Sequence, residues 1–317
     1  MSHDTKSPFR IYTGDSLLEI EESRSHPIVE AFLYENDYVL LVAKEKMGKS
    51  LIAMQLACNI SSGTTFLDTL EVRNPLPIWY FSLEGKDDDM KMRLINMEKK
   101  VPLNKDNFSL ICTPGFEFNT GYGVRLLEEL IHEKKDNLPR VIIIDPLYMA
   151  IKGSIKDDNV ITDFTKVMRK LQDRCNASII VIHHSKRPIR LQNGAILDIG
   201  DDEMFGSAFL KASVDHIFYL ISIANSDHKI LRCRTQRSGH IMDDLEVRLI
   251  QPDPLYFEYA GHIPNMKDEL EKLMVDWTTV KDLQKMTGKS RAGIYNVLKD
   301  MKLDKINSRP VKYKLKK

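Results

Sequence analysis

The chain has 317 residues, a formal net charge of +1, and an ordinary balance of 43% hydrophobic and 29% charged residues. This composition is typical of a soluble globular protein of about two domains. Other classes are excluded, since no apolar run approaches the ~18 residues of a membrane span and the first residues lack the apolar segment of a secretory signal. The four cysteines form no CxxC pair, so we predict a cytoplasmic protein without disulfides or a zinc site.

The charge is unevenly distributed along the chain. Between Lys267 and Lys317 there are fourteen Lys and Arg residues and seven Asp and Glu residues, so this end carries +7 and the remainder about −6. A basic end of this kind is typical of a domain that contacts nucleic acid. The alternative is a solvated, lysine-rich end without a partner.

Residues 1–30 are predicted to form a weakly ordered arm, and from residue 38 to about residue 259 apolar strands alternate with helical patterns. Continuous apolar strands separated by helices indicate an α/β fold, with a mostly parallel sheet covered by helices on both faces. The predicted strands are 38–42, 78–82, 108–111, 141–144, 178–182, 214–221 and 229–234. The predicted helices are 50–61, 88–98, 124–134 and 161–175. Residues 245–259 are predicted to close the sheet as further β-structure.

The first motif follows the strand at 38–42 and consists of Ala43, Lys44, Glu45, Lys46, Met47, Gly48, Lys49, Ser50 and Leu51. A strand, a tight loop, Gly-Lys-Ser and a helix are the context of a phosphate-binding loop, because backbone N–H groups and the helix N-terminus attract phosphate. Lys49 would reach the β- and γ-phosphates of ATP, and the Ser50 hydroxyl would ligate Mg²⁺. Ala43 replaces the first glycine of the pattern, which is acceptable if that position needs no positive φ. An ordinary helix cap is the alternative.

Two acidic residues stand at or just after the ends of apolar strands. Asp145 follows the strand at 141–144, and Glu84 follows the strand at 78–82. Ligands of a nucleotide-binding α/β sheet bind at the carboxyl ends of its strands, so Asp145 is placed to hold the water shell of Mg²⁺. Glu84 is the candidate for orienting and polarising an attacking water. The alternatives are a turn-forming acid and a surface glutamate.

Histidines and arginines follow at the ends of later strands. His183 and His184 could hydrogen-bond a γ-phosphate, or bind a metal, although no Cys or acidic partner stands at ligand spacing. Arg234 and Arg237 belong to an arginine-rich segment, and a guanidinium is suited to stabilising transition-state charge on a phosphoryl group. If this strand lies at a subunit edge, one arginine would reach the neighbour's nucleotide. A surface salt-bridge cluster is the alternative.

The basic end resembles a winged helix-turn-helix. Residues 266–276 have a helical pattern, residues 278–299 fit a helix, a turn at Gly288 and a second helix, and residues 307–315 alternate enough to form a hairpin. If this unit binds duplex DNA, its second helix faces the major groove. The residues that would do so are Lys289, Arg291, Tyr295 and Asn296. Winged helices also mediate protein contacts, which is the alternative.

The order of these motifs resembles the RecA-like ATPases, and most closely the RepA-type hexameric helicases of plasmids and phages, relatives of the DnaB replicative helicases. The resemblance covers roughly residues 31–250 and implies a RecA-like domain over 31–262, followed by the winged helix-turn-helix over 263–317. It also implies that Lys49, Ser50, Glu84 and Asp145 carry the chemistry described above. His183 or His184 would sense the γ-phosphate, and Arg237 would be the trans-acting arginine. The family's auxiliary lysine position holds Thr235, which leaves Arg234 as its substitute.

The resemblance further implies two loops that contact single-stranded DNA in the central channel of a ring. The first loop is residues 150–157 and the second is residues 186–205. Single-strand channels combine basic residues with stacking aromatics. The basic residues that these loops offer are Lys152, Lys156, Lys186, Arg187 and Arg190. The alternative for both is a surface loop without a ligand.

The sequence thus predicts an ATP-hydrolysing, Mg²⁺-dependent motor on DNA, most plausibly a homohexameric replicative helicase of a plasmid, phage or other mobile element. It would translocate on single-stranded DNA, and its C-terminal unit would contact duplex DNA. The second hypothesis is a DNA-binding replication initiator or regulator with a slow ATPase switch, which Ala43 and Thr235 favour. A recombination-type ATPase is the third hypothesis. A small-molecule kinase is the least favoured, because it needs neither the histidine pair nor the arginine-rich strand.

Overall fold

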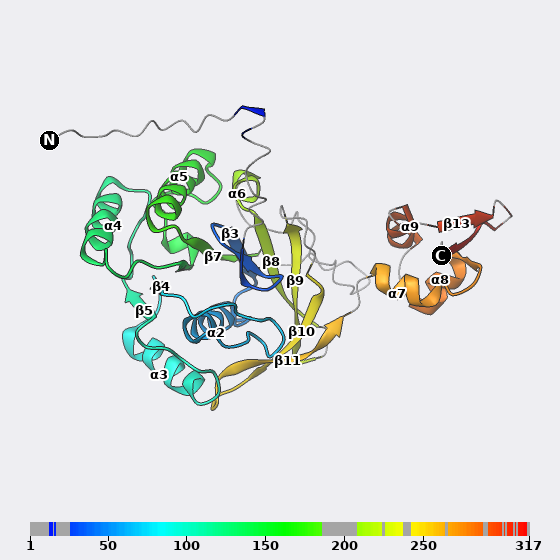
Figure 1. The fold of residues 1–317 in the computed structure, drawn as a ribbon, viewed down its shortest axis with the longest axis horizontal. Coiled ribbons are helices and arrows are strands. Elements are labelled where there is room, and N and C mark those ends of the chain that lie inside the picture. The colour runs from blue at the N-terminus through cyan, green and yellow to red at the C-terminus, as the bar shows by residue number, and fades with distance from the viewer. Residues whose placement is uncertain are drawn as a thin grey trace.

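The computed structural model describes residues 13–14, 16, 26–185, 208–223, 226–236, 242–263, 266–287, 291–299, 301, 303–306, 308 and 310–315. Within them, one nine-stranded sheet forms the centre of the larger region (Figure 1). Its strands are β3 (Tyr38–Ala43), β4 (Ile78–Ser82), β5 (Phe108–Cys112), β6 (Val141–Asp145), β7 (Ser178–His184), β8 (His216–Ser222), β9 (His228–Gln236), β10 (Asp244–Ile250) and β11 (Tyr256–Ile263). They lie in the order β11-β10-β9-β8-β3-β7-β6-β4-β5. The strands from β8 to β5 are parallel, whereas β9, β10 and β11 pair antiparallel.

The parallel strands are apolar throughout because helices cover both faces of the sheet. In β3, Val39 and Leu41 belong to one hydrophobic cluster, while Leu40 and Val42 belong to the other. Figure 1 shows α2 (Lys49–Ser62) and α3 (Asp87–Glu98) on one side, with α4 (Gly121–Glu133) and α5 (Asp158–Cys175) on the other. The predicted α/β architecture, a mostly parallel sheet flanked by helices, is therefore confirmed.

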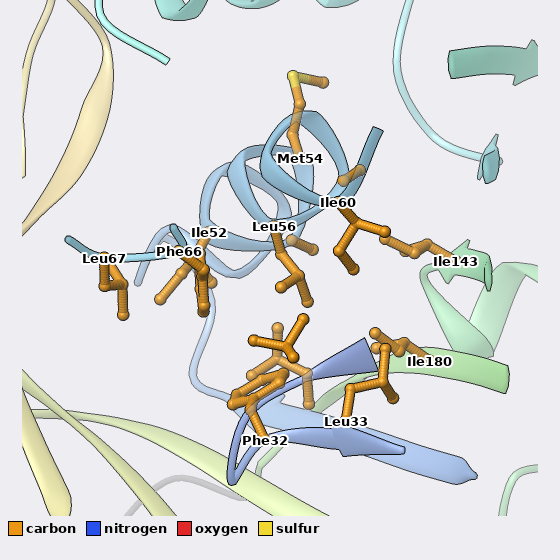
Figure 2. Close-up of a cluster of buried hydrophobic side chains, with 14 of the residues drawn as sticks. Phe32, Leu33, Ile52, Met54, Leu56, Ile60, Phe66, Leu67, Ile143 and Ile180 are labelled. Carbon is orange, nitrogen blue, oxygen red and sulfur yellow. The ribbon is translucent and has the colours of Figure 1, made fainter. Parts of the chain in front are cut away.

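Helix α2 packs along the first face of the sheet (Figure 2). The side chains drawn between the helix and the strands include Phe32, Leu33, Ile52, Leu56, Ile60, Ile143 and Ile180. Phe32 and Leu33 come from the hairpin of β1 (Pro27–Val29) and β2 (Leu33–Tyr34), so packed structure begins by residue 27. Full burial of each such side chain stabilises the fold by about 1.5–3 kcal/mol. This packing fixes the start of α2, and with it the loop that precedes the helix.

All seven predicted strands and four predicted helices are present, with boundaries within three residues of those expected. The largest differences are at helix starts, where polar caps lie outside the apolar pattern. Thr120 Oγ1 accepts a hydrogen bond of 3.0 Å from Gly123 N at the start of α4. Asp157 Oδ1 accepts one of 2.9 Å from Asn159 N at the start of α5. Such caps satisfy N–H groups that have no partner within the helix.

The C-terminal unit, residues 266–315, has its own sheet and its own core. It contains α7 (Met266–Leu273), α8 (Val280–Thr287) and α9 (Arg291–Lys299), together with the antiparallel strands β12 (Thr278–Thr279), β13 (Leu303–Ile306) and β14 (Lys312–Leu315) in the order β12-β14-β13. Its buried residues are Leu270, Met274, Val280, Leu283, Ile294, Leu298 and Met301. Thr279 and Asp282 cap α8, since Thr279 Oγ1 accepts a 3.2 Å hydrogen bond from Asp282 N.

The predicted hairpin at residues 307–315 needs correction. Its strands are Leu303–Ile306 and Lys312–Leu315, so the first strand lies before the predicted range. The reason is packing, because Leu303 and Leu315 both lie against the C-terminal core and pair with each other. No helix in the described part of the chain is long and apolar enough to cross a membrane.

Candidate nucleotide-binding site

Four adjacent parallel strands end at the same edge of the sheet, and the candidate residues follow those ends. The order β3-β7-β6-β4 places the loop after β3 beside the ends of the other three strands. The register pairs Ala43 with His184 and Ser82 with Asp145, and Glu84 comes two residues after Ser82. Residues that are far apart in sequence therefore meet at the carboxyl edge, where ligands bind in open α/β sheets.

The loop at 43–51 has its unusual backbone conformation at its centre and not at its start. Ala43 is the last residue of β3 and is fully buried, and the positive φ angles belong to Lys46 (60°) and Gly48 (89°). Ala43 thus occupies a strand position that does not require glycine. At Gly48 a Cβ atom would lie 2.8 Å from Phe257 Cζ, so both the φ angle and the close approach require glycine there.

The Lys49 ammonium group is buried at the first turn of α2, with the side chain only 6% exposed. Its Nζ donates a hydrogen bond of 2.7 Å to Lys44 O and one of 3.3 Å to His184 Nδ1. Burial lowers the pKa of Lys49, and neighbouring carboxylates oppose that shift. These carboxylates are Asp145, Glu45 and Glu84. The lysine is therefore held at the floor of the loop by groups that a phosphate could replace.

The structure distinguishes the two histidines at the end of β7. His184 lines the cavity beside the loop, whereas His183 is 1% exposed and is absent from the cavity wall. Burial and the Lys49 ammonium both lower the pKa of His184, so its neutral imidazole is favoured. Because an ammonium can only donate, Nδ1 accepts from Lys49 and the ring proton resides on Nε2. The Nε2–H group is then available to donate to a ligand.

Asp145 is a buried carboxylate, 8% exposed, at the end of β6. Burial raises its pKa, while hydrogen bonds from Tyr80 and Ser50 and the charge of Lys49 act in the opposite direction. Tyr80 Oη donates a hydrogen bond of 2.7 Å to Asp145 Oδ2. The sequence analysis did not identify Tyr80, and its one signal was a hydroxyl in the middle of an apolar strand.

Glu84 is held by another tyrosine that the sequence analysis missed. Tyr148 Oη donates a hydrogen bond to Glu84 Oε1, and the Tyr148 ring centroid lies 5.2 Å from that of His184. Burial and the bond to Glu84 raise the pKa of Tyr148, so the hydroxyl stays protonated and donates. Tyr148 lies in the 3-10 turn η1 (Leu147–Met149) directly after β6. Its only sequence signal was its position three residues after Asp145.

These residues surround one cavity of about 640 Å³, within the range of small-molecule sites. The predicted residues that line it are Glu45, Lys46, Gly48, Lys49, Ser50, Leu51, Glu84, Asp145 and His184. The lining residues that the sequence did not indicate are Arg93, Pro146, Tyr148, Lys229, Leu249 and Gln251. Met47 instead packs against the larger hydrophobic cluster. The cavity therefore has a charged end at the strand edge and a mixed wall from β9 and β10.

The oxygen atoms at this edge suit Mg²⁺ that arrives with a nucleotide. Among the described residues, no group of three or more His, Cys, Asp or Glu side chains is arranged to hold a metal ion alone. The Ser50 hydroxyl and the Asp145 carboxylate are hydrogen-bonded neighbours. Mg²⁺ prefers oxygen ligands, keeps several waters and is commonly shared with substrate phosphates. This donor set fits that mode of binding.

Other predicted site residues lie away from the cavity or outside the described residues. Lys152 and Lys156 are exposed in the segment 150–157, where Asn119 Oδ1 accepts a 2.8 Å hydrogen bond from Lys152 N. Arg291 is exposed on α9 and its guanidinium lies 5.6 Å from the Tyr295 ring. The backbone of Arg234 lies in β9 and that of Asn296 in α9, but their side chains are outside the described part. Also outside it are Lys186, Arg187, Arg190, Arg237 and Lys289.

The AAA domain family matches residues 7–188, which is more than half of the chain. The chain belongs to the AAA domain family. Solved structures share its fold, among them a DnaB-like replicative helicase studied with primase, with a TM-score of 0.53 and 16% identity over 71% of this chain and 59% of that one. A KaiC-like protein from the archaeon Pyrococcus horikoshii has a TM-score of 0.51 and 13% identity over 74% of this chain and 94% of that one.

An isolated ATPase domain gives a TM-score of 0.54 at 16% identity, over 72% of this chain and 86% of that one. No curated protein matches the sequence. Family and fold together identify a RecA-like P-loop ATPase whose fold is that of the DnaB-type helicases. The expected RecA-like core is thereby confirmed, whereas the winged-helix resemblance of the C-terminal unit stays a prediction.

Proposed function

We propose that this protein hydrolyses ATP with Mg²⁺ and uses the reaction to translocate on single-stranded DNA, as a hexameric replicative helicase of a plasmid, phage or other mobile element. One observation carries the proposal. The phosphate-binding loop, His184, Asp145 and Glu84 converge on a single cavity at the carboxyl edge of the sheet. A structural ion-pair cluster would not need the strained backbone at Gly48 or a lysine buried among exchangeable partners.

In this proposal the loop binds the phosphates and Lys49 moves from its internal partners to the β- and γ-phosphates. The Lys44 carbonyl and His184 hold the ammonium in place meanwhile, which reduces the ordering needed on binding. Release of His184 Nδ1 from Lys49 leaves its Nε2–H free to donate to a γ-phosphate oxygen. When bound, Mg²⁺ would be held by Ser50 and the water shell on Asp145, and would offset charge on the β- and γ-phosphate oxygens.

Glu84 is the proposed base for the attacking water. Tyr148 occupies Oε1, so Oε2 can accept a hydrogen bond from the water and orient it towards the γ-phosphorus. Arg93, on α3, lines the same cavity and can offset charge on the phosphoryl group. We propose that Arg237 or Arg234 of a neighbouring subunit adds a further cation across a subunit interface.

Coupling to DNA is proposed through the basic segments that follow β6 and β7. The segment 150–157 begins two residues after Tyr148, which contacts the proposed base, so contact at Lys152 or Lys156 lies close to the chemistry. The DnaB-like relative is a replicative helicase, and we extend that role to this chain as part of the proposal. We also propose domain boundaries near residues 31 and 263, with the C-terminal unit as a winged helix-turn-helix.

The test is steady-state ATP hydrolysis with and without single-stranded DNA, using Lys49→Ala as the inactive reference. We expect Lys49→Ala to abolish turnover without unfolding the chain, because the lysine forms no part of either large hydrophobic cluster. Lys170→Ala, which changes an exposed lysine on α5, is the matched control. Stimulation of the unaltered protein by single strands would support a motor, and normal hydrolysis by Lys49→Ala would refute the proposed site.

A DNA-binding initiator or regulator with a slow ATPase switch is the second candidate. The separate C-terminal core favours it, as does a hollow of about 520 Å³ in the C-terminal unit. Polar and charged residues that line this hollow include Lys281, Gln284, Arg291 and Tyr295. Sequence-specific duplex binding by the full chain, combined with slow hydrolysis that ignores single strands, would favour this candidate over the helicase.

A further inference from the structure

The hydroxyl group of Tyr80 lies among the groups that the proposed function assigns to Mg²⁺. Tyr80 is in the middle of β4 and is fully buried. Its Oη is 2.7 Å from Asp145 Oδ2 and 3.3 Å from the backbone oxygen of Ser50. A phenol has a single hydrogen to donate, so the shorter contact defines the main hydrogen bond. One side chain thus connects β4, the end of β6 and the first turn of α2.

The position requires bulk, and only the hydroxyl needs a further explanation. Tyr80 belongs to the hydrophobic cluster between the sheet and α2, where phenylalanine would fill the same space. Burying a hydroxyl without a hydrogen bond costs free energy, and pairing it with a buried carboxylate recovers that cost. Burial and Asp145 raise the pKa of Tyr80, so its hydroxyl remains protonated and acts as the donor.

The carboxylate of Asp145 depends on such a partner. It is 8% exposed, which removes most of the water that would otherwise stabilise its charge. A hydrogen bond at Oδ2 restricts rotation of the carboxylate and leaves the other oxygen atom towards the ligand side. Groups that hold a metal-associated carboxylate from behind commonly contribute 10- to 100-fold to metal affinity.

We propose that Tyr80 is a positioning residue that orients the Asp145 carboxylate relative to Ser50 and thereby sets how tightly Mg²⁺ is taken up with the nucleotide. This inference rests on the proposed function, because it assumes that Mg²⁺–nucleotide binds at this edge. Tyr80 itself touches neither the nucleotide nor the reacting atoms. Its effect is therefore on the concentration of Mg²⁺ that the site needs, more than on nucleotide binding without metal.

The experiment measures binding of a fluorescent ATP analogue to the full-length protein while Mg²⁺ is titrated, and again in EDTA. We expect Tyr80→Phe to raise the Mg²⁺ midpoint about 10- to 100-fold and to leave affinity in EDTA unchanged. Tyr38→Phe is the matched control, since Tyr38 is also a fully buried tyrosine of the same sheet but belongs to the cluster on the opposite face. Tyr38→Phe should retain the midpoint of the unaltered protein.

A double-variant comparison separates positioning from general damage. In an Asp145→Asn background, Tyr80→Phe should produce no further change in the Mg²⁺ midpoint, because the two residues act as a unit. Tyr80→Leu provides a second hydroxyl-free side chain if the phenylalanine variant folds poorly. An unchanged midpoint in the hydroxyl-free variants overturns the inference, as does an equal shift in the Asp145→Asn background. If the unaltered protein binds no nucleotide at all, the proposed function itself fails.

Discussion

The region around the nine-stranded sheet and the C-terminal unit present their candidate residues in opposite ways. In the sheet region, Lys49 and Asp145 are less than 10% exposed and each has defined hydrogen-bond partners. In the C-terminal unit, Arg291 is exposed on α9. Phosphoryl transfer requires preorganised groups shielded from water, whereas binding to a polyanion requires cations that can reach it. The difference in exposure therefore indicates different tasks for the two regions.

The two regions also differ in how much core supports them. Both faces of the large sheet carry extensive buried clusters, while the C-terminal cluster contains only seven buried residues. Small cores leave little stability to spare, because the fraction of surface buried on folding falls with domain size. We therefore expect the C-terminal unit to tolerate less loss of packing than the sheet region.

The largest expected effect is on chemistry in the sheet region alone. Glu84→Gln should lower ATP turnover by about 10²- to 10⁴-fold because the proposed base is lost, while nucleotide affinity and duplex binding stay unchanged. Single-turnover hydrolysis and nucleotide titration would measure this. Glu129→Gln changes an exposed glutamate on α4 and serves as the control. Turnover that survives in Glu84→Gln would remove Glu84 from the proposed mechanism.

The next effect is on the stability of the C-terminal unit. Leu283 is fully buried in its core, so Leu283→Ala should cost about 2–5 kcal/mol. We expect this unit to unfold at a lower temperature while basal ATP hydrolysis persists, as measured by calorimetry and an ATPase assay. Lys285→Ala, an exposed change on the same helix, should leave both unaltered. A parallel loss of nucleotide binding would show that the two regions fold as one unit.

A smaller effect is expected from the loop glycine. Gly48→Ala should cost about 1–3 kcal/mol of stability and weaken nucleotide binding, because the new Cβ would meet the Phe257 ring at 2.8 Å. Gly115→Ala is a sharp control, since Gly115 also has a positive φ of 76° but nothing within 4 Å of a new Cβ. The two variants share the backbone strain, and only Gly48→Ala has the collision. Equal effects of the two would mean that Phe257 moves freely.

The smallest effect is expected on the exposed face of α9. If Arg291 contacts one phosphate, Arg291→Ala should lower duplex affinity by less than about 10-fold and reduce the salt dependence by roughly one unit of slope. Arg291→Lys keeps the charge and should retain most of that slope. Affinity measured against salt concentration provides the test, and ATP hydrolysis without DNA should not change. An unaffected slope would place duplex binding elsewhere.

Local sequence patterns were sufficient for the fold class and for half of the site. Apolar strands without alternation predicted a sheet buried on both faces, because each strand must match a nonpolar layer on either side. Gly48, Lys49 and Ser50 were recognisable since a phosphate loop is built from consecutive residues. Asp145 and Glu84 were recognisable from their position at strand ends, which the parallel topology brings to one edge.

Contacts between distant segments determined the rest. Tyr80 and Tyr148 became part of the site only through hydrogen bonds to Asp145 and Glu84, and nothing in their own neighbourhoods in the sequence indicates those partners. The choice of His184 over His183 as a cavity residue depends on which side of β7 faces the loop. Lys229, Leu249 and Gln251 reach the cavity because β9 and β10 extend the sheet. Hydrogen bonds and cavities depend on positions in space, and only the packed chain brings these positions together.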